Sequence, residues 1–225
     1  MPLSHSTPKF FYLCLHNFIF RLMKMYIRQL LNSEAEAIQR IPVTESFEKS
    51  TELIFNNIHG KGGKLIASGM GKAGQIANNI ATTFSSTGTP SLFLHPSDAQ
   101  HGDLGIIQKN DVLLLISNSG KTREILELVD LSKNLVKNIP IIVITGNPDS
   151  ELGRIADIVI GTGHPDEICP LGLTPTTSTT TMTVIGDLLV VLMMKKIGFS
   201  AEDYAKRHHG GYLGTKSRNT TNRIT

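Results

Sequence analysis

The chain has 225 residues, of which 40% are apolar and 18% are charged, and its formal net charge is +3. This length can bury one full hydrophobic core but leaves no room for a second large domain, so we expect one α/β domain with short extensions. The charge excess is small and no basic stripe with interleaved aromatic residues occurs, which argues against a nucleic-acid partner. The two cysteines, Cys14 and Cys169, lie far apart, which fits a reducing compartment and predicts a cytoplasmic protein.

The N-terminal segment differs in character from the rest of the chain. Its apolar run, residues 10–20, is interrupted by His16 and Asn17, is too short to span a bilayer and is followed by no small-residue cleavage site. We therefore expect no membrane partner. The predicted organisation is a leader or disordered extension over 1–22, the domain over 23–215 and a tail over 216–225.

The middle of the chain alternates short apolar runs with amphipathic segments. Two lead-in helices are predicted over 34–39 and 47–58 from their helical spacing. Strands are predicted near 64–68, 91–95, 111–116, 140–145 and 157–160, and helices between them over 72–86, 122–137 and 149–156. Apolar runs that are buried on both faces and joined by helices indicate a parallel sheet.

The last third of the chain begins with a proline-containing loop over 163–175. A long apolar helix is predicted from about 176 to 197, and a short amphipathic segment follows it up to Arg207. In open parallel sheets the ligand lies at the carboxyl ends of the strands. Segments 69–74, 95–103 and 117–122 all follow strands, so we expect them to line one cleft.

The segment after the third strand carries a group of hydroxyl and amide side chains. Ser117, Asn118, Ser119 and Thr122 surround Gly120 at the start of a predicted helix. Backbone N–H groups, hydroxyls and the positive end of the helix dipole would there meet at one point, which suits a dianionic phosphate. The alternative is that these residues only cap the helix, although one residue is enough for a cap.

The segment after the first strand, Gly69 to Gly74, matches the dinucleotide pattern G-x-G-x-x-G. That pattern also needs an acidic residue at the end of the second strand, where this chain has Leu94 or His95. We therefore expect no nucleotide cofactor, and no other cofactor. Lys72, inside the turn, instead suits a sugar phosphate or a developing enediolate.

Two further polar groups have competing interpretations. His95, Asp98, His101 and Asp103 are close enough in sequence for a metal site, but we favour histidines that contact sugar hydroxyls or cap turns, and expect no metal. The hydroxyl-rich run 174–181 could cap its helix and bond back to the helix carbonyls. Because one residue is enough for a cap, we expect several of these hydroxyls, including those of Thr176 and Ser178, to face the ligand.

Taken together, these residues resemble the SIS-domain sugar isomerases, and within them the arabinose 5-phosphate isomerases of lipopolysaccharide synthesis. The matching segments are 69–74, 86–90, 95–96, 101–105, 117–120, 169–173, 175–176, 178–180, 186–187 and 208 with 210–211. The resemblance implies a three-layer α-β-α SIS domain whose five-stranded parallel sheet has the flavodoxin-like order. It also implies conversion between D-ribulose 5-phosphate and D-arabinose 5-phosphate through an enediol, for Kdo and lipopolysaccharide synthesis.

The resemblance also implies site residues. The family's catalytic positions fall on Lys72, Glu124, Glu167 and His208, with Glu167 as the carbon base, His208 as ring-opening or proton-shuttling group, Lys72 as electrophile and Glu124 as partner carboxylate. Substrate contacts are expected from Gly71, His95, His101, Ser117, Asn118, Ser119, Thr122, Thr176 and Ser178.

The resemblance bears on assembly as well. The helix 184–194 and the lead-in helices offer more apolar surface than one sheet layer can cover, so we expect a homo-oligomer, a tetramer, in which His208 reaches a neighbour's cleft.

The chain departs from the family in three places. Lys121 stands where many members have glutamate, and His209 where they have proline. Longer members continue into a pair of CBS modules, and we expect regulation through those modules to be absent here. Two alternatives remain: another SIS sugar-phosphate isomerase, acting on a heptose or hexulose phosphate, and a non-catalytic sugar-phosphate sensor.

Overall fold

Five parallel strands form the centre of the domain in the computed structural model, which describes residues 7–210, 212 and 216. The strands are β1 (Leu65–Gly69), β2 (Ser91–Phe93), β3 (Val112–Ile116), β4 (Ile141–Thr145) and β5 (Ile158–Gly161). Their order in the sheet is β2-β1-β3-β4-β5. The predicted α/β class, the five-stranded parallel sheet and the flavodoxin-like order are confirmed.

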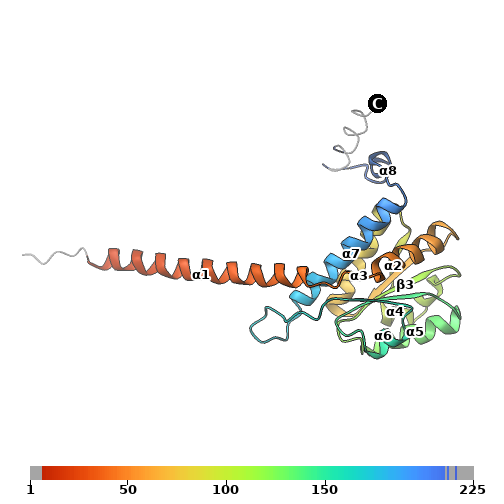
Figure 1. Ribbon diagram of the computed structural model, residues 1–225, viewed down its shortest axis with the longest axis horizontal. Coiled ribbons are helices and arrows are strands. Elements are labelled where there is room, and N and C mark those ends of the chain that lie inside the picture. The colour runs from red at the N-terminus through yellow and green to blue at the C-terminus, as the bar shows by residue number, and fades with distance from the viewer. Residues whose placement is uncertain (1–6, 211, 213–215, 217–225) are drawn as a thin grey trace, which may run out of the picture.

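Helices cover both faces of the sheet (Figure 1). One face packs against α2 (Ser46–Ile54), the π-helical turn η1 (Phe55–His59), α3 (Gly71–Ser86) and α7 (Thr177–Lys196). The other face packs against α4 (Pro96–Ala99), α5 (Arg123–Leu135) and α6 (Glu151–Ile155). The 3₁₀ turn η2 (Asp103–Ile106) follows α4, and α8 (Ala201–Arg207) follows α7. The three-layer arrangement expected from the sequence is therefore present.

The central strand β3 shows why both faces need a helical cover. Val112, Leu114 and Ile116 belong to the core under α3 and α7, while Leu113 and Leu115 belong to the core under α5. Successive side chains of a strand point to opposite faces, so a strand that is apolar at every position must be buried on both sides.

The first helix, α1 (Thr7–Gln39), is longer than the sequence analysis allowed. We expected a helix over 34–39, but residues 7–39 form one helix that projects from the domain (Figure 1). The leader or extension over 1–22 stays a prediction. No glycine or proline interrupts the chain between Lys9 and Gln39, so no residue breaks the helix at position 22. Residues 1–6 of the expected extension lie outside the described residues.

The C-terminal end of α1 packs on the domain through Ala37, which is buried, and Ile38. Farther out, large apolar side chains from Phe18 to Leu31 are exposed on α1.

Among the described helices, only α7 is long and apolar enough to span a bilayer by length and composition. Half of its apolar window is buried inside the domain, as in a core helix, so this is weak support for a membrane span. Beyond α8, Gly211, residues 213–215 and residues 217–225 of the expected tail lie outside the described residues.

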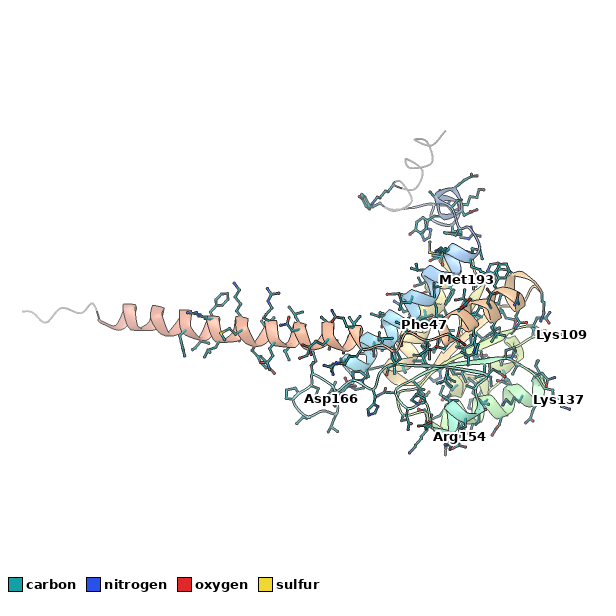
Figure 2. The ribbon with its side chains drawn as sticks, in the orientation of Figure 1. Phe47, Lys109, Lys137, Arg154, Asp166 and Met193 are labelled. Atoms are coloured by element: carbon teal, nitrogen blue, oxygen red, sulfur yellow. The ribbon has the colours of Figure 1, made fainter. Side chains whose placement is uncertain are left out.

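The two edges of the sheet can be located by three side chains in Figure 2. Lys109 and Lys137 precede β3 and β4 and mark the amino edge, whereas Asp166 follows β5 and marks the carboxyl edge. The carboxyl edge is where parallel sheets of this order bind ligands.

Candidate active site

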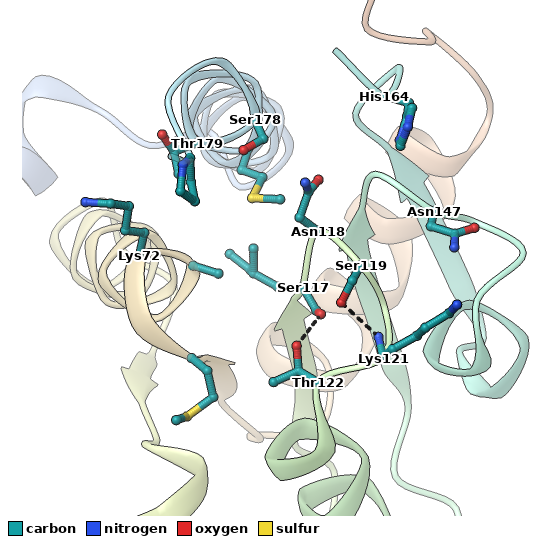
Figure 3. Close-up of a pocket in the computed structure, with 15 residues that line it drawn as sticks. Lys72, Ser117, Asn118, Ser119, Lys121, Thr122, Asn147, His164, Ser178 and Thr179 are labelled. Carbon is teal, nitrogen blue, oxygen red and sulfur yellow. Dashed lines mark hydrogen bonds between the residues drawn. The ribbon is translucent and has the colours of Figure 1, made fainter. Parts of the chain in front are cut away.

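A pocket of about 550 Å³ lies at the carboxyl edge of the sheet (Figure 3). Lys72 lines it after β1, residues 117–119 with Lys121 and Thr122 after β3, Asn147 after β4, and Ser178 at the start of α7. These side chains meet because the strands that precede them run in parallel and end at the same edge. The expected convergence of the segments after β1 and β3 is present.

The turn 117–122 is held by its own side chains and by its neighbours. The hydroxyls of Ser117 and Thr122 are hydrogen-bonded at 2.8 Å, and Ser117 Oγ also accepts from the amide of Gly120 at 3.2 Å. Gly120 has φ +62°, and a Cβ there would lie 1.9 Å from Ser150 Oγ, so only glycine fits. The amide of Lys121 donates to Ser119 Oγ at 3.2 Å.

The turn does not cap the helix that follows it. Thr122 is the N-cap of α5, yet its side chain makes no capping hydrogen bond and pairs with Ser117 instead. The first N–H groups of this 13-residue helix therefore have no side-chain partner at the N-cap and carry the positive end of the helix dipole. This geometry favours the anion-binding interpretation over simple capping.

Lys72 lies across the pocket from this turn (Figure 3). It makes no hydrogen bond or ion pair with any residue that the structure describes, so its ammonium group is available to a ligand. Gly71, which we expected to contact substrate, opens α3 with φ +57° and is not among the residues that line the pocket. Lys121 adds a second positive charge at the pocket, next to the hydroxyl turn.

Glu167 lies at the N-terminus of α7, where it accepts four hydrogen bonds. Oε2 accepts from the amide and hydroxyl of Thr176 at 2.6 and 2.9 Å and from the amide of Ser178 at 3.3 Å, and Oε1 accepts from the hydroxyl of Ser178. Partial burial raises the pKa of Glu167, but the hydrogen bonds from Ser178 and Thr176 outweigh it and leave the pKa below its usual value. The carboxylate is thus kept ionised beside the pocket that Ser178 lines.

These bonds change the interpretation of the hydroxyl-rich run 174–181. The hydroxyls of Thr176 and Ser178, expected to face the substrate, donate to Glu167 instead. Thr179, Thr180 and Thr181 donate back to helix carbonyls three or four residues earlier. Capping and back-bonding therefore account for most of the run, although Ser178 and Thr179 also line the pocket.

Cys169 lies two residues beyond Glu167 in the same loop. Hydrogen bonds from the side chain and amide of Thr174, and from the amides of Leu171 and Leu173, lower the pKa of this thiol to about 6. The loop therefore holds two anionic groups close in sequence at neutral pH.

Three of the four catalytic candidates, Glu167, Glu124 and His208, are not among the residues that line the pocket. Glu124 occupies the first turn of α5 and is half-buried. His208 follows α8, beyond the C-terminal end of α7, whereas the pocket lies at the N-terminal end of that 20-residue helix. A helix of this length spans about 30 Å, so the structure does not bring His208 to Lys72 within one chain.

The ring of His208 is held in one orientation. It stacks on Tyr204 with centroids 3.7 Å apart, and its Nδ1 lies 3.0 Å from the carbonyl oxygen of Tyr204. A carbonyl can only accept, so Nδ1 carries the proton and Nε2 of the neutral ring is free to accept one.

The segment after β2 does not contribute to the pocket. His95 precedes α4, and His101 lies in an exposed turn before η2. We expected both to contact the substrate, but neither lines the pocket. The Nδ1 of His95 lies 3.9 Å from an oxygen of Asp98. Within the described part of the chain, no group of three or more histidine, cysteine or carboxylate side chains has the geometry to hold a metal ion.

Sequence reasoning missed two polar residues of the pocket, Asn147 and His164. Asn147 follows β4 and His164 follows β5, so both lie at the same sheet edge as the predicted segments. Their position directly after a strand is the signal by which the sequence could have identified them. His164 adopts φ +51° and places Nδ1 3.0 Å from the carbonyl oxygen of Gly146.

Comparison with known proteins gives a consistent result. The SIS domain family matches residues 58–192. Arabinose 5-phosphate isomerase KdsD of Yersinia pestis is 46% identical over 191 residues, which are 84% of this chain and 56% of that protein. The chain thus spans about half the length of the curated relatives it matches.

Solved structures show the same similarity over nearly their whole length. A proposed phosphosugar isomerase involved in capsule formation, from Bacteroides fragilis, is 65% identical, with a TM-score of 0.83 over 84% of this chain and 99% of that one. An Escherichia coli CFT073 protein, solved in complex with arabinose 5-phosphate, is 33% identical, with a TM-score of 0.76 over 83% of this chain and 97% of that one.

Proposed function

The chain belongs to the SIS domain family, and on that basis we propose that it is an aldose–ketose isomerase that interconverts D-ribulose 5-phosphate and D-arabinose 5-phosphate. The observation that carries this proposal is the pocket in which a free lysine faces an uncapped, hydroxyl-lined helix N-terminus. The E. coli relative solved with arabinose 5-phosphate supports the choice of substrate class.

The phosphate group would bind at the turn 117–122. The hydroxyls of Ser119 and Thr122, the amide groups at the start of α5 and the charge of Lys121 all suit a dianion. With the phosphate at this end, the sugar carbons extend toward Lys72 on the opposite side of the pocket (Figure 3).

The reaction needs only proton transfers. In the direction from ketose to aldose, a proton leaves C1 and a proton is added at C2, while a hydroxyl proton moves from O1 to O2 through the enediol. The sugar gains and loses no electrons overall, so the proposed reaction needs no redox cofactor. Lys72 would stabilise the negative oxygen of the enediolate, and Glu167 is the proposed carbon base: it is ionised and its partner Ser178 lines the pocket, although the hydrogen bonds that lower its pKa also lower its basicity.

We further propose that the protein works as a homo-oligomer, a tetramer, in which His208 of one subunit completes the pocket of another. Two surfaces support this assembly. Large apolar side chains are exposed on α1 from Phe18 to Leu31. A groove of about 1140 Å³ between α2 and α7 is lined by Val43, Phe47, Leu188 and Val191. Exposed apolar surface of this extent is typical of subunit interfaces.

Subunit mixing tests this assembly. Lys72→Ala and His208→Ala should each be inactive, but in mixed dimers one of the two sites would have both residues. Complete exchange should therefore restore up to about a quarter of the wild-type activity in a two-fold arrangement. A mixture that stays inactive after proven subunit exchange would place the complete site within one chain.

We propose that this activity serves Kdo and lipopolysaccharide synthesis, as the name KdsD of the relatives suggests, and that it takes place in the cytoplasm, as expected from the cysteine content of the sequence. The direct test is incubation with ribulose 5-phosphate in deuterated water, followed by NMR identification of the product sugar. Arabinose 5-phosphate with deuterium at C2 is the expected product, and Lys72→Ala is the control. Ribose or xylulose phosphate as the product, or no conversion, would contradict the proposal.

A further inference from the structure

Glu34 joins the base of the projecting helix α1 to the loop that carries Glu167. Its position on α1 is three residues before the buried Ala37, where the helix meets the domain. Glu34 Oε1 accepts a hydrogen bond of 2.8 Å from the hydroxyl of Thr177, the first residue of α7. The two residues are 143 positions apart in the chain, so only the tertiary fold brings them together.

The hydroxyl of Thr177 serves two partners at once. It donates its single proton to Glu34 and accepts a hydrogen bond of 3.1 Å from the amide of Ile168. Because Thr177 is only 1% exposed, water does not compete for these bonds. The Glu34 carboxylate therefore fixes the direction of the hydroxyl proton and leaves a lone pair for the amide of Ile168.

Ile168 is the residue directly after Glu167. The carboxylate of Glu167 is bound by Thr176 and Ser178, the two residues that flank Thr177. Two carboxylates thus meet three consecutive hydroxyl residues at the start of α7. Glu167 accepts hydrogen bonds from Thr176 and Ser178, and Glu34 accepts one from Thr177 between them.

The second oxygen of Glu34 makes this arrangement costly. Oε2 is buried and has no hydrogen-bond partner among the described residues. A buried acceptor without a donor is unfavourable, so stability alone gives no reason for a carboxylate here. Glu36, two positions along α1, provides a contrast, because it is exposed and pairs with Arg40 at 2.9 Å.

We propose that Glu34 is a positioning residue for the isomerisation: through Thr177 and the amide of Ile168, it fixes the geometry of the loop that carries Glu167. This inference rests on the proposed function for its effect on turnover. The link itself can be observed without activity, in the hydrogen exchange of the loop 166–176.

The test compares Glu34→Ala with Glu36→Ala, an exposed control on the same helix, and Thr177→Val with Thr177→Ser, which keeps the hydroxyl. Glu34→Ala and Thr177→Val should each lower kcat by about 10-fold to 100-fold, since misplacing a catalytic group by an ångström has effects of this size. KM for ribulose 5-phosphate should change less than about twofold, because the phosphate turn lies on β3 and α5. Glu36→Ala and Thr177→Ser should behave like the wild type.

Hydrogen exchange separates this proposal from the proposed function. Faster exchange in the loop 166–176 of Glu34→Ala, with a melting temperature close to that of the wild type, is expected whether or not the protein isomerises ribulose 5-phosphate. Unchanged exchange in folded Glu34→Ala would overturn the positioning role. If Glu34→Ala does not fold, the comparison of Thr177→Ser with Thr177→Val takes its place. A kcat as low in Thr177→Ser as in Thr177→Val would also overturn the positioning role.

Discussion

Two segments of this molecule look alike in sequence and are used differently in the structure. Residues 117–122 and 174–181 are both rich in hydroxyls, and both lead into a helix, α5 and α7 respectively. In the first segment the hydroxyls bond within the turn, and the start of α5 has no side-chain cap. In the second, Glu167 already occupies the start of α7.

The comparison teaches that a hydroxyl-rich helix start predicts an anion site. It does not tell whether the anion is a ligand or a carboxylate of the chain itself. At α5 the N-cap side chain makes no capping hydrogen bond, so the first amide groups, near Glu124 in the first turn, can donate to a ligand phosphate. At α7 the chain supplies its own carboxylate, which becomes ionised and oriented beside the same pocket. Four predictions test this division between an open and a filled helix start.

The largest expected effect comes from the filled site. Glu167→Gln removes the proposed base, and we expect kcat for ribulose 5-phosphate to fall about 100-fold or more, with binding largely retained. Steady-state rates and equilibrium binding of arabinose 5-phosphate should be measured separately. Asp166→Asn, a change at the exposed neighbouring carboxylate, is the control. Near-normal turnover in Glu167→Gln would remove this residue from the mechanism.

The open site should show the opposite pattern. Replacing Ser119 with Ala and Thr122 with Val should raise KM for ribulose 5-phosphate by about 10-fold or more, because hydrogen bonds to a charged group are lost. Weak activity on unphosphorylated arabinose should change little. Thr179→Val is a matched control, since this hydroxyl lines the same pocket but donates to the carbonyl of Thr176. Equal losses on both sugars would mean that the turn does not hold the phosphate.

A smaller effect is expected at Cys169, in the loop of the filled site. With its pKa lowered to about 6 by hydrogen bonds from Thr174 and nearby amides, this thiol is mostly ionised at pH 7. Its lower basicity partly offsets this gain, so alkylation by iodoacetamide at pH 7 should be only about threefold faster than for a free cysteine.

The pH dependence of alkylation is the sharper measurement. The rate should rise with a midpoint near pH 6, because the thiolate is the nucleophile. Cys169→Ser leaves Cys14 as the remaining thiol and gives the background. A midpoint near about 8.5, the value of a free cysteine, would show that the loop does not hold the thiolate.

The smallest expected effect concerns stability. Ser178→Ala removes hydrogen bonding to Glu167 and should lower the free energy of unfolding by about 1 kcal/mol, or Tm by about 2–4 °C, at pH 7. The pKa of Glu167 is lower in the folded than in the unfolded protein, so its stabilisation is full above the unfolded pKa and is lost as the pH falls through the folded pKa. The difference in Tm between wild type and Ser178→Ala should therefore shrink below about pH 4. An unchanged difference at pH 3 would contradict this account.

The sequence predicted the sheet and the open site well because both depend on local patterns. Strands that are apolar at every position, such as β3, and segments that directly follow strands, such as Lys72 and the turn 117–122, need no tertiary knowledge. The hydrogen bonds from Thr176 and Ser178 to Glu167 could not be predicted, because Glu167 lies nine and eleven residues earlier across a loop, although Ser178 does line the pocket as expected.

Two other features could not be read locally. His208 matched a family motif, but its distance from the pocket depends on the full length of α7. Helix α1 was predicted only over 34–39, whereas it covers residues 7–39, because a helix can extend wherever no breaking residue occurs.

The contact between Gly120 and Ser150 couples the shape of the turn 117–122 to the position of helix α6. The hydroxyl of Ser150 occupies the space of a Cβ at position 120, and the carbonyl of Gly120 accepts a hydrogen bond of 3.1 Å from the amide of Leu152. These contacts hold the turn in one conformation, so we expect little conformational entropy to be lost when a ligand binds. Because Gly120 also has φ +62°, we expect related proteins to keep glycine at 120 and to carry a residue no larger than serine at 150.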